Sequence, residues 1–177
     1  MVEYDVVYLG RLHHQKGVLE LMDIWKYMEE YSLVVIGNGR LMDECLAKAR
    51  GNITFVGDKY GKERDDIIKS CKVAVHPSIY DSGGMALANC MSFGLPGVSF
   101  DLPALKNYYP AGVVKVPCFD KRQFAKEIIR LLEDPQFYEL KKTEALDLIN
   151  NYWRWDIQAG KIWNYMMLCL SAHQAGQ

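Results

Sequence analysis

The stretch HPSIYDSGGMALANCMSFGLPGVSFD, residues 76–101, decides the fold predicted for this chain. The apolar run 73–75 before it indicates a buried strand, and Pro77 ends that strand because proline has no N–H to donate. After a turn that contains two glycines, residues 85–93 indicate a short helix, and the apolar run 98–100 indicates the next strand. The stretch is therefore one strand–loop–helix–strand unit.

The glycines at the entry of this helix suggest an anion site. The first N–H groups of a helix have no partner inside it, and the helix dipole adds partial positive charge there. Glycines such as Gly83 and Gly84 let a phosphate approach the backbone closely. We therefore expect the amides of Gly84, Met85 and Ala86 to point at a ligand.

Two further groups of polar residues are expected at the same site. Asn89 lies one helical turn after Met85, so its amide can reach the ligand from the side, and Asp81 lies on the rim. Arg11 and Lys16 flank a loop at the C-terminal end of the first predicted strand, where open α/β sheets bind ligands. Two cations there suit a diphosphate. The alternatives are a tight turn followed by a core helix, and a solvated basic loop.

Length and composition indicate one intracellular domain. The chain has 177 residues, half of them hydrophobic, with 21 Lys+Arg against 22 Asp+Glu, and this balance argues against a nucleic-acid partner. Five scattered cysteines and four histidines without metal-ligand spacing argue against a disulfide framework or a metal site. Because the chain has neither a signal-peptide pattern nor an apolar run near the roughly 20 residues of a membrane span, we expect a soluble, cytoplasmic protein.

Apolar runs alternate with helical patterns along the whole chain. Strands are expected at residues 5–9, 32–36, 53–56, 73–75, 98–100 and 111–114. Helices are expected at residues 18–31, 40–50, 67–71, 85–93, 121–133 and 136–150, followed by a last helix at about 156–170. This alternation predicts an α/β fold, a doubly wound Rossmann-like parallel sheet in three α/β/α layers, over a single domain, residues 1–177. The segments 59–66 and 101–109 are interpreted as solvated surface and loop.

Three other features have competing interpretations. The sequence Gly-Asn-Gly at 37–39, with Asp58 after the next strand, looks like part of a dinucleotide fingerprint, but Met42 stands where the third glycine belongs. An NAD-type Rossmann domain is thus one alternative. His76 is interpreted as a core histidine in preference to a residue lining the site. Aromatic residues near the C-terminus are expected to pack the last helix onto the domain or to meet an absent partner domain: Tyr152, Trp153, Trp155, Trp163 and Tyr165.

Taken together, these features resemble the C-terminal, donor-binding domain of the retaining group 1 glycosyltransferases, which have the GT-B fold. The matching pieces are Gly10-Arg11 with Lys16-Gly17, the glycines of 37–39, the strand 52–57, the stretch from Pro77-Ser78 to Pro96, and Trp155-Asp156 before the last helix. The resemblance covers nearly the whole chain, and the order and spacing of these pieces are more specific than any single motif.

The resemblance implies a nucleotide-diphospho-sugar donor on this domain and an N-terminal acceptor domain that this chain lacks. The last helix would cross toward that domain, and the acceptor would be a saccharide or a lipid-linked glycan. Transfer would retain the anomeric configuration, without a bound metal or other cofactor, in polysaccharide or glycolipid assembly. The full-length protein could then be peripheral at the inner membrane face, and the isolated domain inactive.

The resemblance also implies the roles of single residues. Arg11 and Lys16, with Gly10 beside them, would neutralise the diphosphate, and the amides of residues 84–86 would complete the phosphate site. The family has two glutamates eight positions apart, and these positions are Asp81 and Asn89 here. Asp81 keeps the carboxylate, whereas Asn89 is neutral, and charged hydrogen bonds are about twice as strong as neutral ones. We expect weaker ribose binding or an unusual donor. A degenerate, non-catalytic nucleotide-sugar-binding module is the other alternative.

Overall fold

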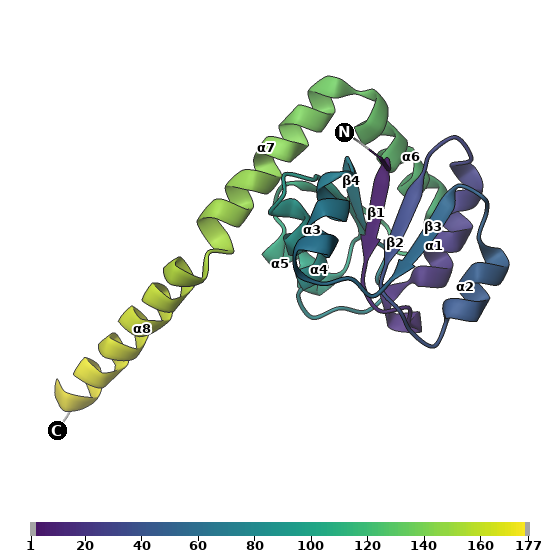
Figure 1. Ribbon diagram of the computed structural model, residues 1–177. Coiled ribbons are helices and arrows are strands. Elements are labelled where there is room, and N and C mark those ends of the chain that lie inside the picture. The colour runs from purple at the N-terminus through teal and green to yellow at the C-terminus, as the bar shows by residue number, and fades with distance from the viewer. Residues whose placement is uncertain (1–2, 176–177) are drawn as a thin grey trace.

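The computed structural model describes residues 3–175, with side chains to residue 171, so the ends of the predicted domain 1–177 lie outside the described residues. All strands of its sheet run parallel, in the order β3-β2-β1-β4-β5-β6 (Figure 1). The strands are β1 Val6–Leu9, β2 Leu33–Ile36, β3 Ile53–Gly57, β4 Val73–His76, β5 Gly97–Phe100 and β6 Val113–Val116. The order reverses between β1 and β4, which confirms the doubly wound Rossmann-like sheet.

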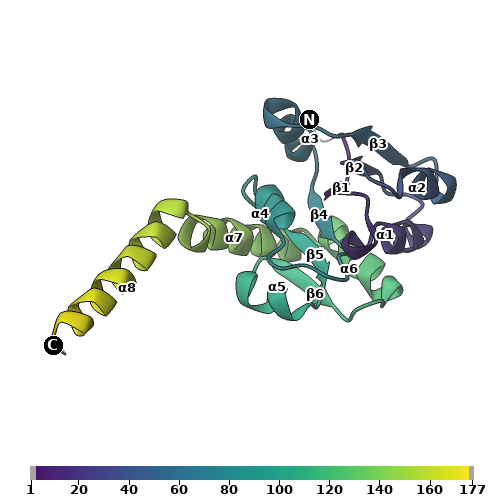
Figure 2. The same cartoon turned by 90° about the horizontal axis from the view of Figure 1, so that it is seen from below.

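Helices cover both faces of this sheet (Figures 1 and 2). The helices are α1 Val18–Ile24, α2 Met42–Lys48, α3 Gly61–Lys69, α4 Met85–Met91, α5 Pro103–Tyr108, α6 Lys121–Glu133, α7 Pro135–Tyr152 and α8 Trp155–Ala175, with 3-10 turns η1 His14–Lys16 and η2 Trp25–Tyr27. Helices α1, α2 and α6 share one apolar core with the sheet, and α3, α4, α5 and α7 share the other. These are the predicted three layers.

The central strands are short and are buried on both faces. Val, Ile and Leu make up β2 and predominate in β1, and β4 is buried along its whole length, as is typical of parallel strands covered by helices. Successive side chains point to opposite faces, so Val6 belongs to the core of α1, α2 and α6, whereas Val7 belongs to the other core. In the central pairings, Val6 lies opposite Leu33 and Val73.

Two segments that are expected to be irregular, residues 59–66 and 101–109, are largely helical. Helix α3 begins at Gly61 and not at residue 67, because its first turns are charged and carry no apolar period that could predict a helix. Lysine–carboxylate pairs four residues apart support these turns: Lys62 pairs with Asp66 on the exposed surface of the helix, and Lys59, just before the helix, pairs with Glu63. Helix α5 occupies most of the predicted loop 101–109, with Pro103 in its first turn and Leu105 buried.

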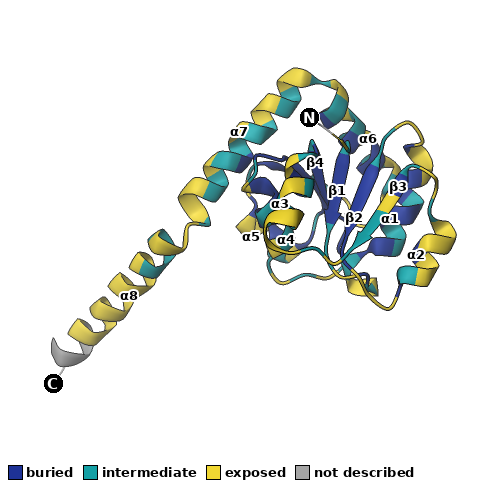
Figure 3. Ribbon diagram, viewed as in Figure 1, coloured by how far each residue is buried: buried dark blue, intermediate teal, exposed yellow. Residues whose placement is uncertain are grey.

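The last helix, α8, extends away from the sheet, whereas α7 packs against the body of the domain (Figure 2). Figures 1 and 2 show α7 leading from the body of the domain and α8 continuing outward from its end. Figure 3 shows most of the described part of α8 exposed, except for half-buried residues in its first turn, and Trp155, Trp163 and Tyr165 are 79%, 62% and 70% exposed. The prediction that these aromatic residues pack the last helix onto the domain is therefore wrong for all three. Only Trp153, at the end of α7, is partly buried among them. None of the helices in residues 3–175 is both long enough and apolar enough to cross a membrane.

Candidate functional site

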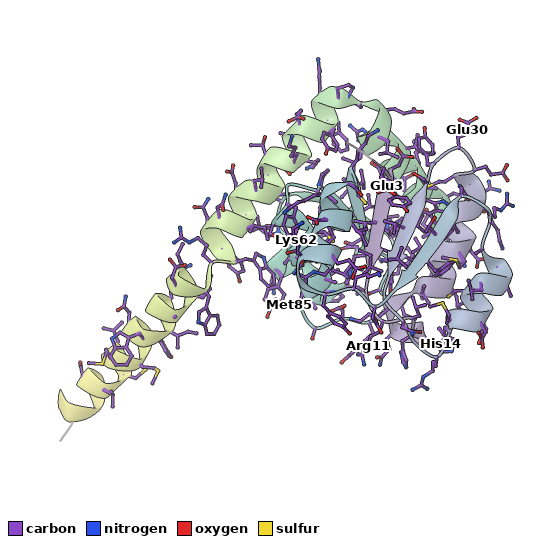
Figure 4. All side chains as sticks on the ribbon, in the orientation of Figure 1. Glu3, Arg11, His14, Glu30, Lys62 and Met85 are labelled. Atoms are coloured by element: carbon purple, nitrogen blue, oxygen red, sulfur yellow. The ribbon has the colours of Figure 1, made fainter. Side chains whose placement is uncertain are left out.

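The candidate site lies at the edge of the sheet where the strands end. The chain leaves β1 at Leu9 and β4 at His76, and these neighbouring strands are the point at which the strand order reverses. Open α/β sheets bind ligands in the crevice at this point. Figure 4 shows Arg11, His14 and Met85 along this edge, whereas Glu3 and Glu30 lie toward the opposite one.

The loop after β1 is docked onto the segment after β4. Gly17 has a left-handed backbone, and a Cβ there would lie 1.8 Å from the carbonyl oxygen of Pro77, so only glycine fits. The carbonyl oxygen of Gln15 accepts hydrogen bonds from the amides of Ile79, at 3.0 Å, and Tyr80, at 3.2 Å. This docking carries Lys16, which lies between Gln15 and Gly17, toward Asp81.

Asp81 is the centre of a polar cluster. Its Oδ2 lies 2.6 Å from Lys16 Nζ and 3.0 Å from His76 Nε2. Its Oδ1 accepts hydrogen bonds from the amides of Gly83, at 3.1 Å, and Gly84, at 2.8 Å. We call these five residues the Asp81 cluster, and residues 81–84 the glycine loop. The side chain of Asp81 is only 7% exposed.

The cluster keeps Asp81 ionised. Burial alone raises the pKa of this carboxyl because it disfavours the charged form. The hydrogen bonds from His76 and Lys16, and from the two glycine amides, outweigh burial and hold the pKa well below its ordinary value. An ionised carboxylate can only accept hydrogen bonds, so Nε2 of His76 is assigned the proton. His76 is buried, as expected of a core histidine, and it also lines the site, which is the less favoured of the two interpretations of the sequence.

Two of the predicted donors are already occupied. The amide of Gly84, expected to face a ligand, donates to Asp81, because Asp81 turns its carboxylate back onto its own loop. Lys16, expected to be free for a diphosphate, is paired with Asp81. The amides of Met85 and Ala86 donate to no other group among residues 3–175. The sequence could not show this self-pairing, because Lys16 and Asp81 meet only through the fold.

Arg11 and Gly10 lie beside the cluster. They line a cavity of about 210 Å³ together with residues that follow β2 and β3, among them Asp58, Lys59 and Tyr60. Arg11 is exposed, and it forms no ion pair with any other residue in the described part of the chain. It is therefore a cation that an anionic ligand can reach without breaking an existing pair.

Asn89 lies in α4, in the turn after the glycine loop. Its Oδ1 is buried and has no hydrogen-bond partner among the described residues. A buried polar atom without a partner is unusual in folded proteins and needs an explanation. A bound ligand with a donor group would satisfy it.

The glycines at 37 and 39 are explained by packing alone. A Cβ on Gly37 would lie 2.0 Å from the carbonyl oxygen of Gly10, and one on Gly39 would lie 2.3 Å from that of Leu12. The loop after β2 therefore needs glycines to approach the loop after β1. No dinucleotide is required to account for them, so the geometry gives the NAD-type alternative no support. Among residues 3–175, no group of three or more His, Cys, Asp or Glu side chains could hold a metal ion.

Comparison with known proteins decides the family. The family model described as glycosyl transferases group 1 matches residues 2–147. The chain belongs to this family. The sequence is 27% identical over 154 residues to an alpha-D-kanosaminyltransferase from Streptomyces kanamyceticus, covering 81% of this chain and 40% of that protein. The chain thus spans less than half the length of the first curated relatives that it matches.

Solved structures of this family's fold are similar over most of the chain. Sucrose-phosphate synthase from Thermosynechococcus elongatus superposes with a TM-score of 0.79 at 20% identity, over 96% of this chain and 47% of that one. HepE from Anabaena, solved in complex with UDP-glucose, gives a TM-score of 0.73 at 16% identity, over 82% of this chain and 43% of that one. Identities this low establish the fold alone. The chain has the fold of a C-terminal GT-B domain, as the resemblance implies.

Proposed function

We propose that this chain is the donor-binding domain of a retaining glycosyltransferase, and that it holds the diphosphate of a nucleotide sugar where β1 and β4 end. One observation carries the proposal: the loops after these two strands meet there and bring Lys16 to Asp81. Group 1 membership supports the donor class, and so does HepE, a structure of the same fold that was solved with UDP-glucose.

The cations of the site would take the place of a metal ion. Arg11 is exposed and has no ion-pair partner in the described chain, and the ammonium of Lys16 has two more N–H groups besides the one used by Asp81. Both can face the diphosphate. Fixed positive charge beside a leaving nucleoside diphosphate stabilises the charge that develops on it, and we expect this stabilisation to contribute most to catalysis at the site.

Asp81 and Asn89 would flank the donor. The carboxylate of Asp81 lies in the same cluster as Lys16, so it is close to the sugar-bearing phosphate in this arrangement. Asn89, with its unpartnered oxygen, would accept a hydrogen bond from a ribose hydroxyl. That bond is neutral, and it is weaker than the bond that a glutamate would make at the same position.

The acceptor would be a saccharide or a lipid-linked glycan, held by a second domain. Helix α8 supports this part of the proposal, because large apolar side chains lie exposed along it, among them Trp155, Trp163 and Leu168. Burial of such side chains is favourable, and the second domain would provide the surface for it. The isolated chain would then bind the donor and transfer nothing.

A thermal-shift panel of this chain with UDP, GDP, ADP and NAD tests the proposal. A ligand at 100 times its dissociation constant should add about 2.7 kcal/mol, or several degrees in Tm for a domain of this size. We expect one nucleoside diphosphate to stabilise the wild type, and Arg11→Ala to abolish the shift. Lys126→Ala, which removes an exposed cation of α6, should keep it.

The remaining results of the thermal-shift panel would contradict the proposal. Stabilisation by NAD alone, or by none of these nucleotides, would overturn the donor-domain proposal. A chain that binds a nucleoside diphosphate within a full-length protein that transfers no sugar would be the non-catalytic binding module instead.

A further inference from the structure

The glycine loop is held from two directions. Asp81 accepts from the amides of Gly83 and Gly84, as described above. The hydroxyl of Tyr109, at the end of α5, donates to the carbonyl oxygen of Gly84 at 2.7 Å and lies 3.1 Å from that of Gly83. Tyr109 is fully buried, and its ring would lie 3.2 Å from a Cβ on Gly84. The backbone of the two glycines therefore has little freedom while Tyr109 stays in place.

Tyr109 in turn is held by Trp153. The two rings are stacked with their centroids 5.5 Å apart and an interplanar angle of 25°. Trp153 caps the C-terminal end of α7, and only Arg154 separates it from the start of α8. Its indole Nε1 is buried without a hydrogen-bond partner among the described residues, so the ring is held by stacking and packing alone. Trp153 therefore lies between Tyr109 and the start of α8.

We propose that Tyr109 and Trp153 are positioning residues that couple the junction of α7 and α8 to the glycine loop. The direction in which α8 leaves the domain then sets how firmly Tyr109 holds the carbonyl groups of Gly83 and Gly84. The proposal rests on the proposed function, since an ordered glycine loop matters for donor binding. It gives the outward helix a physical connection to a site from which it is otherwise remote (Figure 1).

Amide hydrogen exchange on the ligand-free chain tests the coupling. The amides to follow are those of Gly83 and Gly84, which donate to Asp81, and of Leu87, which donates to the carbonyl oxygen of Gly84 at 2.8 Å. Trp153→Ala should raise their exchange rates about fivefold, the effect of losing one typical hydrogen bond. Trp155→Ala, which removes an exposed ring on α8, should leave these rates unchanged.

Two more variants separate coupling from a loss of overall stability. Trp153→Phe keeps an aromatic ring in the stack and should restore the wild-type rates. Tyr109→Phe keeps the ring but removes the hydroxyl, so it should raise the same rates while the amides of β5 stay protected. If Trp153→Ala leaves the loop unchanged, or raises exchange equally in the loop and in β5, the coupling is wrong.

Titration with UDP, GDP and ADP connects the coupling to donor binding. If one of them binds the wild type, Tyr109→Phe should weaken its affinity by about three- to tenfold. Unchanged affinity would overturn the role of Tyr109 as a positioning residue for the donor. If no nucleotide binds the wild type, the donor-domain proposal has failed, whereas the exchange rates still decide whether Trp153 controls the loop.

Discussion

Lys16 Nζ lies 2.6 Å from Asp81 Oδ2, although 65 positions separate the two residues in the chain. The pair joins the loop after β1 to the loop after β4 across the reversal point of the sheet. Its side chains are 25% and 7% exposed, so water screens it less than it would screen a surface pair. The pair therefore holds the two loops together. It also contains the charged groups that we propose face the donor.

Removal of Asp81 should destabilise the domain. Asp81→Ala leaves Lys16, His76 and two glycine amides without their acceptor, and a partly buried pair broken in this way costs about 2–3 kcal/mol. The Tm should fall by roughly 4–12 °C. Asp66→Ala is the matched control, because Asp66 also pairs with a lysine but on the exposed surface of α3. The Tm of this variant should stay close to that of the wild type. Equal effects of the two substitutions would contradict this role of Asp81.

Acid should weaken the fold through the same carboxylate. The pKa of Asp81 in the folded chain lies below its ordinary value of 3.8, so the unfolded chain binds more protons between the two values. The contribution of Asp81 is therefore fully present above about pH 5 and is lost as the pH falls toward the folded pKa. Urea unfolding should show the stability gap between wild type and Asp81→Ala narrowing from about pH 5 to about pH 3.

Asp23 does not affect the pH dependence of this stability difference. Hydrogen bonds from Lys121 and Lys26 lower the pKa of Asp23 to about 2. This contribution is the same in the wild type and in Asp81→Ala, so it cancels when the two stabilities are subtracted. A gap that stays constant with pH would show that Asp81 is not held ionised by the cluster.

Gly84→Ala should destabilise the glycine loop more than Gly83→Ala. Gly84 has φ of +62°, and an alanine Cβ there would lie 3.0 Å from Leu105 Cδ2. The left-handed backbone alone costs about 1–2 kcal/mol. Gly57→Ala isolates this backbone cost, since Gly57 has φ of +70° and open space around it. At Gly83 a Cβ would only reach ordinary contact with Tyr108, at 3.8 Å. Equal Tm values for the Gly83 and Gly84 variants would contradict the geometry.

Asn89→Glu should change how the donor is held. A carboxylate at this position would make a charged hydrogen bond to a ribose hydroxyl, about twice as strong as the neutral bond of Asn89. We expect tighter binding of the nucleoside diphosphate, or a different preference among UDP, GDP and ADP, in calorimetric titrations. If neither affinity nor preference changes, Asn89 does not contact the ribose.

Most strands could be predicted because a short apolar run marks each of them. The sixth strand lies at Val113–Val116 and not at the predicted residues 111–114, because Lys115 interrupts its apolar run. Helix α3 could not be predicted over its full length, because its first turns are charged and lack a helical spacing of apolar residues. Helix α5 could not be predicted either, because Leu105 is its one buried residue. In both segments local pairs and tertiary contacts form the helix where the sequence has no helical periodicity.

The candidate site could be predicted in part. The sequence predicts which residues lie near the reversal point, because they follow the strands β1 and β4. It does not predict that Lys16 pairs with Asp81, because this contact depends on the close approach of Gly17 to Pro77. From the sequence, His76 could be a core residue or could line the site, and the preferred interpretation is only half of the answer, because His76 is buried and also contacts Asp81. Tyr109 joins the site from a segment that has no motif at all.

Binding of a nucleoside diphosphate where β1 and β4 end can be tested by an amide NMR titration of this chain with UDP, the nucleotide present in solved structures of the same fold. We expect the signals of residues 11–17 and 83–86 to shift together along one binding curve, because in the proposed complex the diphosphate lies between the two loops. We also expect Arg11→Ala to weaken the binding. Shifts confined to other parts of the sheet, with both loops unperturbed at saturation, would contradict this proposal.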